Sequence, residues 1–575
     1  MKKIILSFAT LIATQMYGQG LESIQNITPQ TPETNAILKS FETPVSLYTG
    51  SPDISVPIYT INEGDINFGL KLSYNSTGIT IGERASWVGL GWNLSIPVLV
   101  RTVRQLPDDL PGGFFYETQF TVNKVNTIKS VVTADTPLDQ YTTVCPQCTD
   151  IDVRYNAGNL DLESDDYRLT LPDGKSISFM VNQERDAQYP IGHIVQFPDS
   201  DYKIEYSTTS GNWEITTPQG YKYIYIAGNR MGSSHVYTVG GNSIGTEPLT
   251  KSVPYTSTWV LSKIISPGNS VLNFGYDPIT YEDCDLVNQT KTVEVDEAFL
   301  PNDGRNYVYT NYSKTRGTNL FINRIWGDFG EVIFNKEERL DYITYGKKLS
   351  SIEIKNQSGA AVNKIAFDFD YMTSIAPGIR YNCNRPLNIN DIVKRLMLKS
   401  VRFNVNSLKP LAYQFNYNSI PLPDRMSYAR DWWGYYNGKE SNTGLTPSID
   451  VTMMEVNNRD VRPEFAQAGT LEEIVYPTGG KTKFTFESNR GIFHDYNNMA
   501  SSKYHDIIPY RLKTQYFSTS EDKTSMLNKV YNFPVTYNTG EMTTKPIQTI
   551  EIHTNTNQCI YPEGTLPLGN SCSIY

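Results

Sequence analysis

One pattern recurs along this chain and restricts the folds that are open to it. In each copy two apolar residues stand three positions apart, a turn rich in Pro, Gly or Asn follows, and a strand with large residues at alternate positions comes next. The apolar pairs of the clear copies are Leu261/Ile264, Ile322/Ile325, Leu349/Ile352, Leu398/Val401 and Leu471/Ile474. A pair at this spacing also suits a helix, but the Pro and Gly a few residues later leave no room for one. Each copy is therefore predicted to be a β-hairpin.

A succession of such hairpins predicts one long sheet. Weaker copies flank the turns Leu171-Pro-Asp-Gly174 and Thr217-Pro-Gln-Gly220, so the pattern begins well before Leu261. A single hairpin is only marginally stable, and one with an aromatic face has to stack on its neighbours. We expect an all-β fold in which repeated β-hairpins form a large coiled sheet or partial hollow shell, with very little helix.

The composition agrees with a folded, β-rich chain. Charged residues make up 19% of the 575 positions, below the usual quarter, and 39 Tyr together with many Asn, Ser and Thr take their place. These residues suit half-solvated strands and turns better than helices, which excludes an all-α fold. Pro and Gly, at 32 and 40 residues, are too few for a low-complexity chain.

The one strongly apolar segment lies at the amino terminus. Lys2 and Lys3 precede an apolar stretch over residues 4–16, and Gly18 offers a small residue for cleavage, which is the plan of a secretory signal peptide. The stretch is shorter than the roughly 20 residues that a membrane-spanning helix needs. We predict export to the extracellular space, the cell surface or the periplasm, and no transmembrane segment in the mature chain.

The same features divide the chain into six parts. They are a signal peptide (1–18), an extended leader (19–44), an N-terminal β region (45–110), a β-rich region with degenerate hairpins (111–250), a hairpin-repeat shell (251–490) and a C-terminal β segment (491–575). The net charge is −10, and no basic run exceeds a pair such as Lys347-Lys348. Because nucleic-acid binding requires a basic surface, no nucleic-acid partner is expected.

Six cysteines follow the signal peptide, an even number that permits up to three disulfides in an oxidising compartment. Cys145 and Cys148 have the spacing of a redox motif, but a local structural disulfide is the favoured interpretation. Cys559 and Cys572 are expected to pair across a terminal loop whose Pro and Gly residues favour turns. No second close cysteine pair or histidine cluster completes a zinc site, so no metal is expected here.

The most aromatic stretch of the chain is the candidate ligand-binding site. Its members are Asp431, Trp432, Trp433, Tyr435, Tyr436 and Asn437. Aromatic faces with a flanking carboxylate and amide suit the rings of a sugar. The favoured interpretation is structural: a loop whose indoles pack against the inside of the sheet, with glycines that permit tight turns. Core packing is likewise favoured for Trp87 and Trp92.

Three acidic clusters are candidates for Ca²⁺ binding or for acid–base chemistry. They are Asp108-Asp109, Glu163-Ser-Asp-Asp166 and Glu282-Asp-Cys-Asp285. No calcium-loop motif accompanies them, and sequence spacing does not fix the carboxylate separation that glycoside hydrolysis requires. We expect solvated loops first and calcium second, with no other cofactor and no catalytic residue.

Several motifs go beyond the repeat pattern. They are Val45-Ser-Leu-Tyr-Thr-Gly50, Ala85-Ser-Trp-Val-Gly-Leu-Gly-Trp-Asn-Leu94, Arg430-Asp-Trp-Trp-Gly-Tyr-Tyr-Asn-Gly438 and Tyr476-Pro-Thr-Gly-Gly480. In their order and spacing they resemble the amino-terminal half of the RHS/YD-repeat proteins exported by Gram-negative bacteria, over roughly residues 40–490. The strict Tyr-Asp-x-x-Gly-Arg signature is missing, since Tyr276-Asp277 is followed by Pro278-Ile279.

The resemblance implies a class of function. Proteins of this kind form a shell of coiled β-hairpins that encloses a toxic or effector domain, or they present an adhesive surface. We therefore expect an exported, non-enzymatic β-shell protein that acts as scaffold or casing for an effector polypeptide, or as a surface module that binds a glycan. The alternative is a secreted carbohydrate-active enzyme with a carboxylate pair near Trp432 and Trp433.

Overall fold

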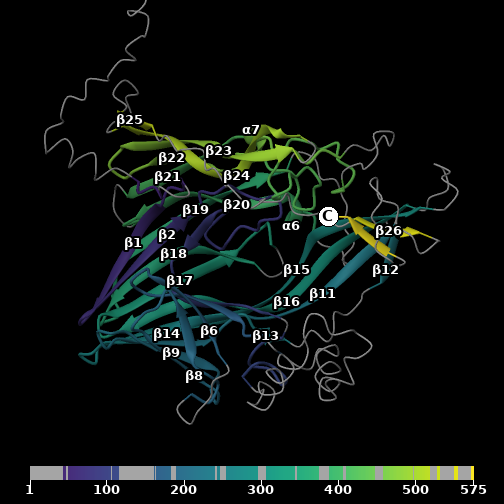
Figure 1. Cartoon of the computed structure of the whole chain (residues 1–575). Coiled ribbons are helices and arrows are strands. Elements are labelled where there is room, and N and C mark those ends of the chain that lie inside the picture. The colour runs from purple at the N-terminus through teal and green to yellow at the C-terminus, as the bar shows by residue number, and fades with distance from the viewer. Residues whose placement is uncertain are drawn as a thin grey trace, which may run out of the picture. The chain divides into compact units, whose positions relative to one another are not determined.

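In the computed structural model of the chain, the regular structure is almost wholly β-strand, and the strand pairs are antiparallel except for β15 with β26 (Figure 1). It separates into two units, Met1–Pro44 and Val45–Tyr575. The predicted signal peptide lies outside the described residues. The structure describes residues 43–46, 50–104, 106–115, 161, 163–182, 189–239, 242–245, 254–295, 306–342, 346–374, 388–405, 410–446, 457–495, 498–518, 527–530, 550–554 and 571–574.

Strands account for nearly all of the regular structure. The first half contains β1 (Ile54–Glu63), β2 (Ile66–Tyr74), β3 (Trp92–Leu94), β4 (Val98–Thr102), β5 (Asp166–Thr170), β6 (Ser176–Val181), β7 (Ile194–Phe197), β8 (Lys203–Ser207), β9 (Asn212–Thr216), β10 (Lys222–Ala227), β11 (Arg230–Val239), β12 (Asn242–Gly245), β13 (Tyr255–Thr256) and β14 (Thr258–Ile265). The second half contains β15 (Val271–Val295), β16 (Asn306–Gly327), β17 (Gly330–Glu338), β18 (Lys347–Asn356), β19 (Ala361–Thr373), β20 (Lys394–Phe403), β21 (Leu411–Tyr417), β22 (Leu471–Val475), β23 (Lys481–Asp495), β24 (Asn498–Ser518), β25 (Leu527–Val530), β26 (Ile550–Thr554) and β27 (Ser571–Ile574). The helices of the described part, α6 (Asn390–Val393) and α7 (Pro463–Ala466), have four residues each. The predicted all-β fold with very little helix is confirmed.

Most strands belong to one antiparallel ladder. From β14 each strand pairs with the next one along the chain, through to β25. At the other end of the ladder, β14 pairs with both β4 and β10. The sheet continues from β4 through β5 and β6 to β7, and from β10 through β9 to β8. The seven predicted hairpins are all present as consecutive paired strands, which confirms them.

The spacing of the apolar pairs has a structural cause that the sequence did not reveal. In each clear copy the register shifts by one residue directly after the first apolar residue of the pair. The extra residues, which have no counterpart in the neighbouring strand, are Ser262, Asn323, Ser350, Lys399 and Glu472. Such a β-bulge adds one residue between two positions that face the same side. Both apolar residues of every pair are therefore buried, although a regular strand would place them on opposite faces.

One hairpin shows why its turn requires glycine. The turn between β16 and β17 is closed by Gly327 opposite Gly330, with two residues between them. Gly330 has φ +125°, and a Cβ there would lie 2.2 Å from the carbonyl oxygen of Lys355. Any larger residue would clash with the backbone of β18, so this position accepts only glycine without rearrangement.

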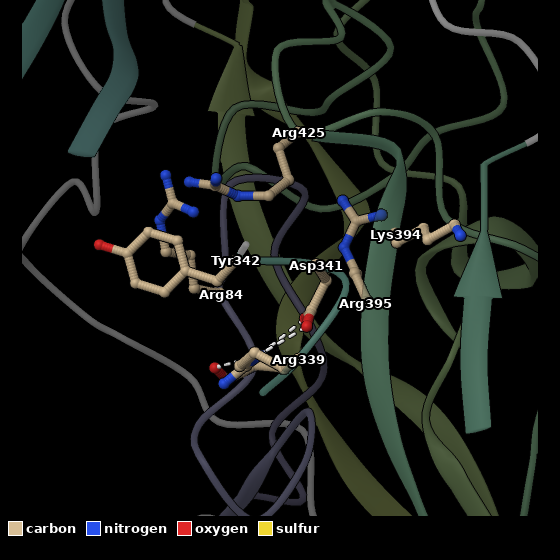
Figure 2. A pocket seen from close by; sticks show the side chains of 8 residues that line it. Arg84, Arg339, Asp341, Tyr342, Lys394, Arg395 and Arg425 are labelled. Carbon is tan, nitrogen blue, oxygen red and sulfur yellow. Dashed lines mark hydrogen bonds and ion pairs between the residues drawn. The ribbon is translucent and has the colours of Figure 1, made fainter. Parts of the chain in front are cut away.

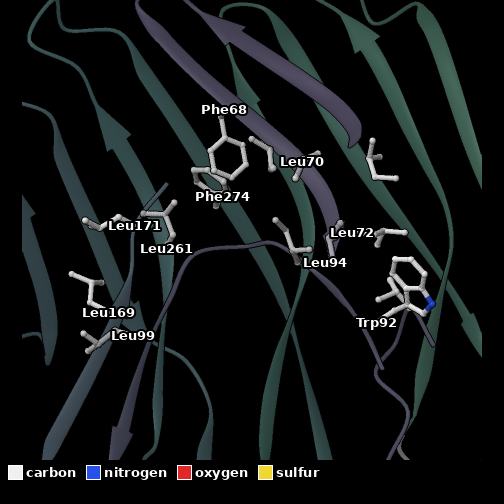
Figure 3. Close-up of a cluster of buried hydrophobic side chains, with 14 of the residues drawn as sticks. Phe68, Leu70, Leu72, Trp92, Leu94, Leu99, Leu169, Leu171, Leu261 and Phe274 are labelled. Carbon is white, nitrogen blue, oxygen red and sulfur yellow. The ribbon is translucent and has the colours of Figure 1, made fainter. Parts of the chain in front are cut away.

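A separate sheet, β1–β2–β3, covers the apolar face of the ladder. In β1 and β2 buried and exposed residues alternate. The buried side chains join one hydrophobic core with the ladder strands (Figure 3). Phe68 meets Phe274 edge to face at 5.2 Å between ring centroids, and Trp92 meets Phe415 at 4.7 Å. Core packing of Trp92 is confirmed, and the half-buried Trp87 packs against Phe321 at 5.6 Å.

Candidate functional site

The aromatic stretch Asp431–Asn437 is held as a compact turn within the segment that connects β21 and β22. The carboxylate of Asp431 has no exposed surface. Its Oδ1 accepts hydrogen bonds from the backbone N–H groups of Trp433 and Tyr435, both at 2.9 Å. Gly434 supplies the positive φ, +94°, that the turn needs. The carboxylate therefore shapes the turn.

The remaining residues of this stretch fasten the turn to the rest of the molecule. Asn437 is buried, and its Nδ2 donates to the carbonyl oxygen of Asn458 at 2.9 Å. Tyr435 forms an isolated β-bridge with Thr80, which precedes β3. The rings of Tyr436 and Phe465 meet edge to face at 5.4 Å.

The two indoles of the stretch, in contrast, keep exposed surface. Both Trp432 and Trp433 are half-buried. The guanidinium of Arg459 stacks 4.8 Å from the ring centroid of Trp432 and donates to the backbone oxygen of Asp431 at 2.6 Å. Burial raises the pKa of Asp431 to about 6. Its Oδ2 has no hydrogen-bond partner among the described residues.

Beside this turn lies a cluster of cations that sequence reasoning missed. Figure 2 shows the side chains of Arg84, Arg339, Arg395 and Arg425 gathered around a small cavity with Asp341, Tyr342 and Lys394. They come from four places: the connection between β2 and β3, the end of β17, the start of β20 and the segment after β21. The cavity measures about 10 Å³, room for one water-sized occupant. The available signal in the sequence was the position of Lys394 and Arg395 between the apolar residues Ile392-Val393 and Leu396-Met-Leu398.

Three of these arginines have carboxylate partners. Arg339 forms two hydrogen bonds to Asp341, Nε to Oδ1 at 2.8 Å and Nη2 to Oδ2 at 2.6 Å. Arg84 pairs with Asp283 at 2.8 Å, and Arg425 pairs with Asp285. Arg339 and Arg425 also donate to backbone carbonyl oxygens between Gly82 and Ser86. The cluster therefore ties the loop before β3 to the ladder.

Arg395 differs from its neighbours because no carboxylate among the described residues pairs with it. Its side chain is 1% exposed, and Nη2 donates to the carbonyl oxygen of Ile81 at 2.8 Å. Nε and Nη1 have no partner in the part of the chain that the structure describes. Burial, and then the charge of Arg425, lower the pKa of Arg395 to about 9. The guanidinium still carries its charge at neutral pH.

A second buried cluster has the opposite charge. The prediction of solvated side chains is wrong for Asp108 and Asp165, which have no exposed surface. Asp108 Oδ1 accepts the N–H of Asp165 at 3.1 Å, and Asp165 Oδ2 accepts the N–H of Asp108 at 3.0 Å. Arg101 lies beside them, with Nε 3.6 Å from Asp165 and Nη1 2.6 Å from Asp109. The third predicted cluster, around Glu282, lies in strand β15 and not in a loop.

Burial dominates the protonation of this acidic cluster. It raises the pKa of Asp161 to about 7. Burial and mutual repulsion raise the pKa of Asp108, which also accepts a hydrogen bond from Tyr167 at 2.9 Å. Burial likewise raises the pKa of Asp165, although Arg101 opposes the shift. Within the described ranges no group of carboxylates, histidines or cysteines has the geometry to hold a metal ion.

The predicted disulfide residues lie elsewhere. Cys145, Cys148 and Cys559 are outside the described residues, as is the side chain of Cys572 in β27. Cys284, in β15, is buried and disulfide-bonded. Over the described residues, no helix combines the length and apolar character needed to cross a membrane.

Comparison with known proteins gives matches to solved structures alone. No family model matches the chain, and no curated protein matches it. The structural neighbours are toxin-complex and effector proteins. TcdB2-TccC3 is 11% identical over 66% of this chain and 17% of its own, with a TM-score of 0.27. The N-terminal domain of the effector protein SpvB from Salmonella typhimurium is 10% identical over 83% of this chain and 99% of its own, with a TM-score of 0.21.

A third match is the Tc holotoxin pore of Photorhabdus luminescens, 11% identical over 65% of this chain and 16% of its own, with a TM-score of 0.25. The chain thus spans less than a fifth of the toxin-complex chains that it matches. At these identities and TM-scores the likeness establishes no shared activity.

Proposed function

We propose that the chain is an exported, non-enzymatic β-scaffold that holds or encases a partner polypeptide, or presents a surface that binds a glycan. We also propose that the protein is located outside the inner membrane, because the predicted signal peptide implies export. The resemblance to RHS/YD-repeat proteins motivates the effector polypeptide as the first candidate partner.

The observation that carries the proposal is how the buried polar side chains are used. Asp431, Asn437, Arg339 and Arg425 have the chemistry of a functional site, yet each is used to fix a loop through hydrogen bonds to backbone groups. Asp431 and Asn437 fix the turn in the connection between β21 and β22, and Arg339 and Arg425 hold the loop before β3. Buried polar networks that are hydrogen-bonded in this way give rigidity and a unique structure. A rigid sheet whose loops are locked in place is what a scaffold needs.

The test is the native mass of the protein isolated from its own cells and medium, with denaturing mass spectrometry of every chain present. A scaffold or casing is expected to run as a heavier assembly with a second polypeptide at a fixed ratio. A single species near the chain mass of 65.0 kDa, or lighter by the signal peptide, would contradict the casing. The glycan-binding module would then be tested by glycan-array binding.

One observation favours the alternative, a carbohydrate-active enzyme. A carboxyl group whose pKa is raised by burial is what a general acid requires, and Asp431 has such a pKa beside two half-exposed indoles. Asp431 has no exposed surface, however, so a substrate oxygen would reach it only if the turn opened.

Asp431→Asn separates the two functions. The amide oxygen can still accept the N–H groups of Trp433 and Tyr435, so the turn keeps its shape, while the acid is lost. An enzyme would lose its turnover of the glycan, whereas a binding module would keep its glycan affinity. Asp460→Asn is the matched control, since Asp460 lies in the same segment but is exposed.

A further inference from the structure

The cation cluster beside the turn contains a charge that the protein leaves without a counter-charge. Arg84, Arg339 and Arg425 each pair with one carboxylate, whereas Arg395 pairs with none within the described residues. Glu83, Asp341 and Asp424 are near enough to influence Arg395 but too far to form an ion pair with it. An unpaired charge buried in a protein is strongly destabilising.

The geometry around Arg395 indicates where a compensating group would lie. The cavity is lined by Arg395 together with the other arginines and Lys394. Nη2 of Arg395 is occupied by the carbonyl oxygen of Ile81, whereas Nε and Nη1 have no partner among the described residues. A guanidinium N–H that no oxygen accepts can donate to an anion.

The size and polarity of the cavity select the ligand. About 10 Å³ admits one water-sized occupant, which favours a monatomic anion over phosphate, sulfate or a carboxylate. A halide is little larger than a water molecule and brings the negative charge that Arg395 lacks. Water would bring none, and it also needs acceptors for its own hydrogens, whereas this lining consists mainly of donors.

We propose that this cavity binds one halide ion, held by an N–H of Arg395, at Nε or Nη1, in the positive field of Arg84, Arg339, Arg425 and Lys394. The half-buried side chains of Arg84 and Lys394 mark the side from which the ion enters. The halide completes the cluster that ties the loop before β3 to the ladder. The site is independent of the proposed scaffold function.

Thermal unfolding of the full chain tests the proposal. A ligand that binds only the native state raises the melting temperature with its concentration. We expect a rise of a few degrees in sodium bromide over sodium gluconate at equal ionic strength, because gluconate is far too large for the cavity. Equal melting temperatures in the two salts would overturn the proposal.

Two variants localise the effect. Arg395→Met removes the charge at similar volume and is expected to abolish the difference between bromide and gluconate. Arg316→Met, at a side chain that is 67% exposed, is expected to retain it. A difference that persists in Arg395→Met would place the ion elsewhere and contradict the proposal.

Anomalous scattering from bromide-soaked crystals of the unaltered chain gives an answer even if Arg395→Met fails to fold. A bromide peak within hydrogen-bond distance of Nε or Nη1 supports the site. A water molecule in the cavity, with no anomalous peak there, would overturn it.

Discussion

Two buried clusters of opposite charge lie in the described part of the molecule, and they offset the cost of burying charge in different ways. In the acidic cluster, Asp108, Asp161 and Asp165 are buried with one arginine close by, and burial raises the pKa of each. A carboxyl group can lose its charge by taking up a proton. In the cationic cluster, burial lowers the pKa of Arg395 only to about 9 and that of Arg425 to about 10. These groups keep their charge at neutral pH.

The difference teaches where each cluster is vulnerable. The stability contributed by the acidic cluster depends on pH, because its buried carboxyl groups are neutral only while they are protonated. The cationic cluster depends on its partners, because carboxylates, carbonyl oxygens or an anion are the remaining means of compensation. Substitutions that remove one carboxylate should therefore act very differently in the two clusters.

The largest effect is expected from Asp341→Asn in the cationic cluster. The change removes the charge that pairs with Arg339 and leaves a buried guanidinium without a counter-charge. Loss of one partner of a buried pair typically costs about 3–5 kcal/mol. Urea denaturation followed by tryptophan fluorescence measures the change, and a loss below about 1 kcal/mol would show that the cluster does not need its carboxylates.

A smaller effect is expected from pH, acting through the acidic cluster. The pKa of Asp161 is about 7 in the folded chain against an ordinary value of 3.8, so between these values the folded state holds a proton that the unfolded state has lost. Stability should therefore fall as pH rises from about 4 through 7, by about 1.4 kcal/mol per pH unit for each such proton.

Melting temperatures across this range measure the effect. Asp161→Asn should make the profile flatter, because the neutral amide mimics the protonated acid. An unchanged slope would mean that Asp161 is ionised in the folded chain. Groups with a lowered pKa, such as Asp368 beside Arg402, act in the opposite direction, and their contribution is lost only as pH falls below about 4.

The smallest effect is expected at an exposed pair with the same geometry as Arg339 and Asp341. Arg402 binds Asp368 through two hydrogen bonds, at 2.6 and 2.7 Å, but the side chains are 43% and 37% exposed. Exposed pairs contribute about 0–1 kcal/mol. Asp368→Asn is therefore the matched control for Asp341→Asn, and similar losses in the two variants would refute burial as the cause of the difference.

The sequence predicted the hairpins because their signals are local. Alternating large residues, followed by Pro, Gly or Asn turns, specify strand and turn within about a dozen residues. The structure of the turn at Asp431 was likewise foreseeable, since Asp and Gly at fixed offsets favour such turns. Gly434 was foreseeable for the same reason, because the turn needs a residue with positive φ.

The two buried charge clusters could not be predicted, because segments far apart in the sequence build them. Asp108 meets Asp165 across 57 positions of the chain, and Arg395 meets Ile81 across 314. Neither the burial of these groups nor their protonation has a local signature. The acidic stretches looked like solvated loops because charged residues are usually exposed.

By itself, the sequence determined that this chain forms successive β-hairpins with one apolar face. The tertiary structure decided how the apolar pairs three apart, such as Leu349 and Ile352, come to lie on that face. Their spacing fits a helix or a bulged strand equally well, and the bulge at Ser350 is defined only when β17 pairs alongside. The same pairing decided which charges are buried, because removal from water depends on neighbours that the local sequence does not contain.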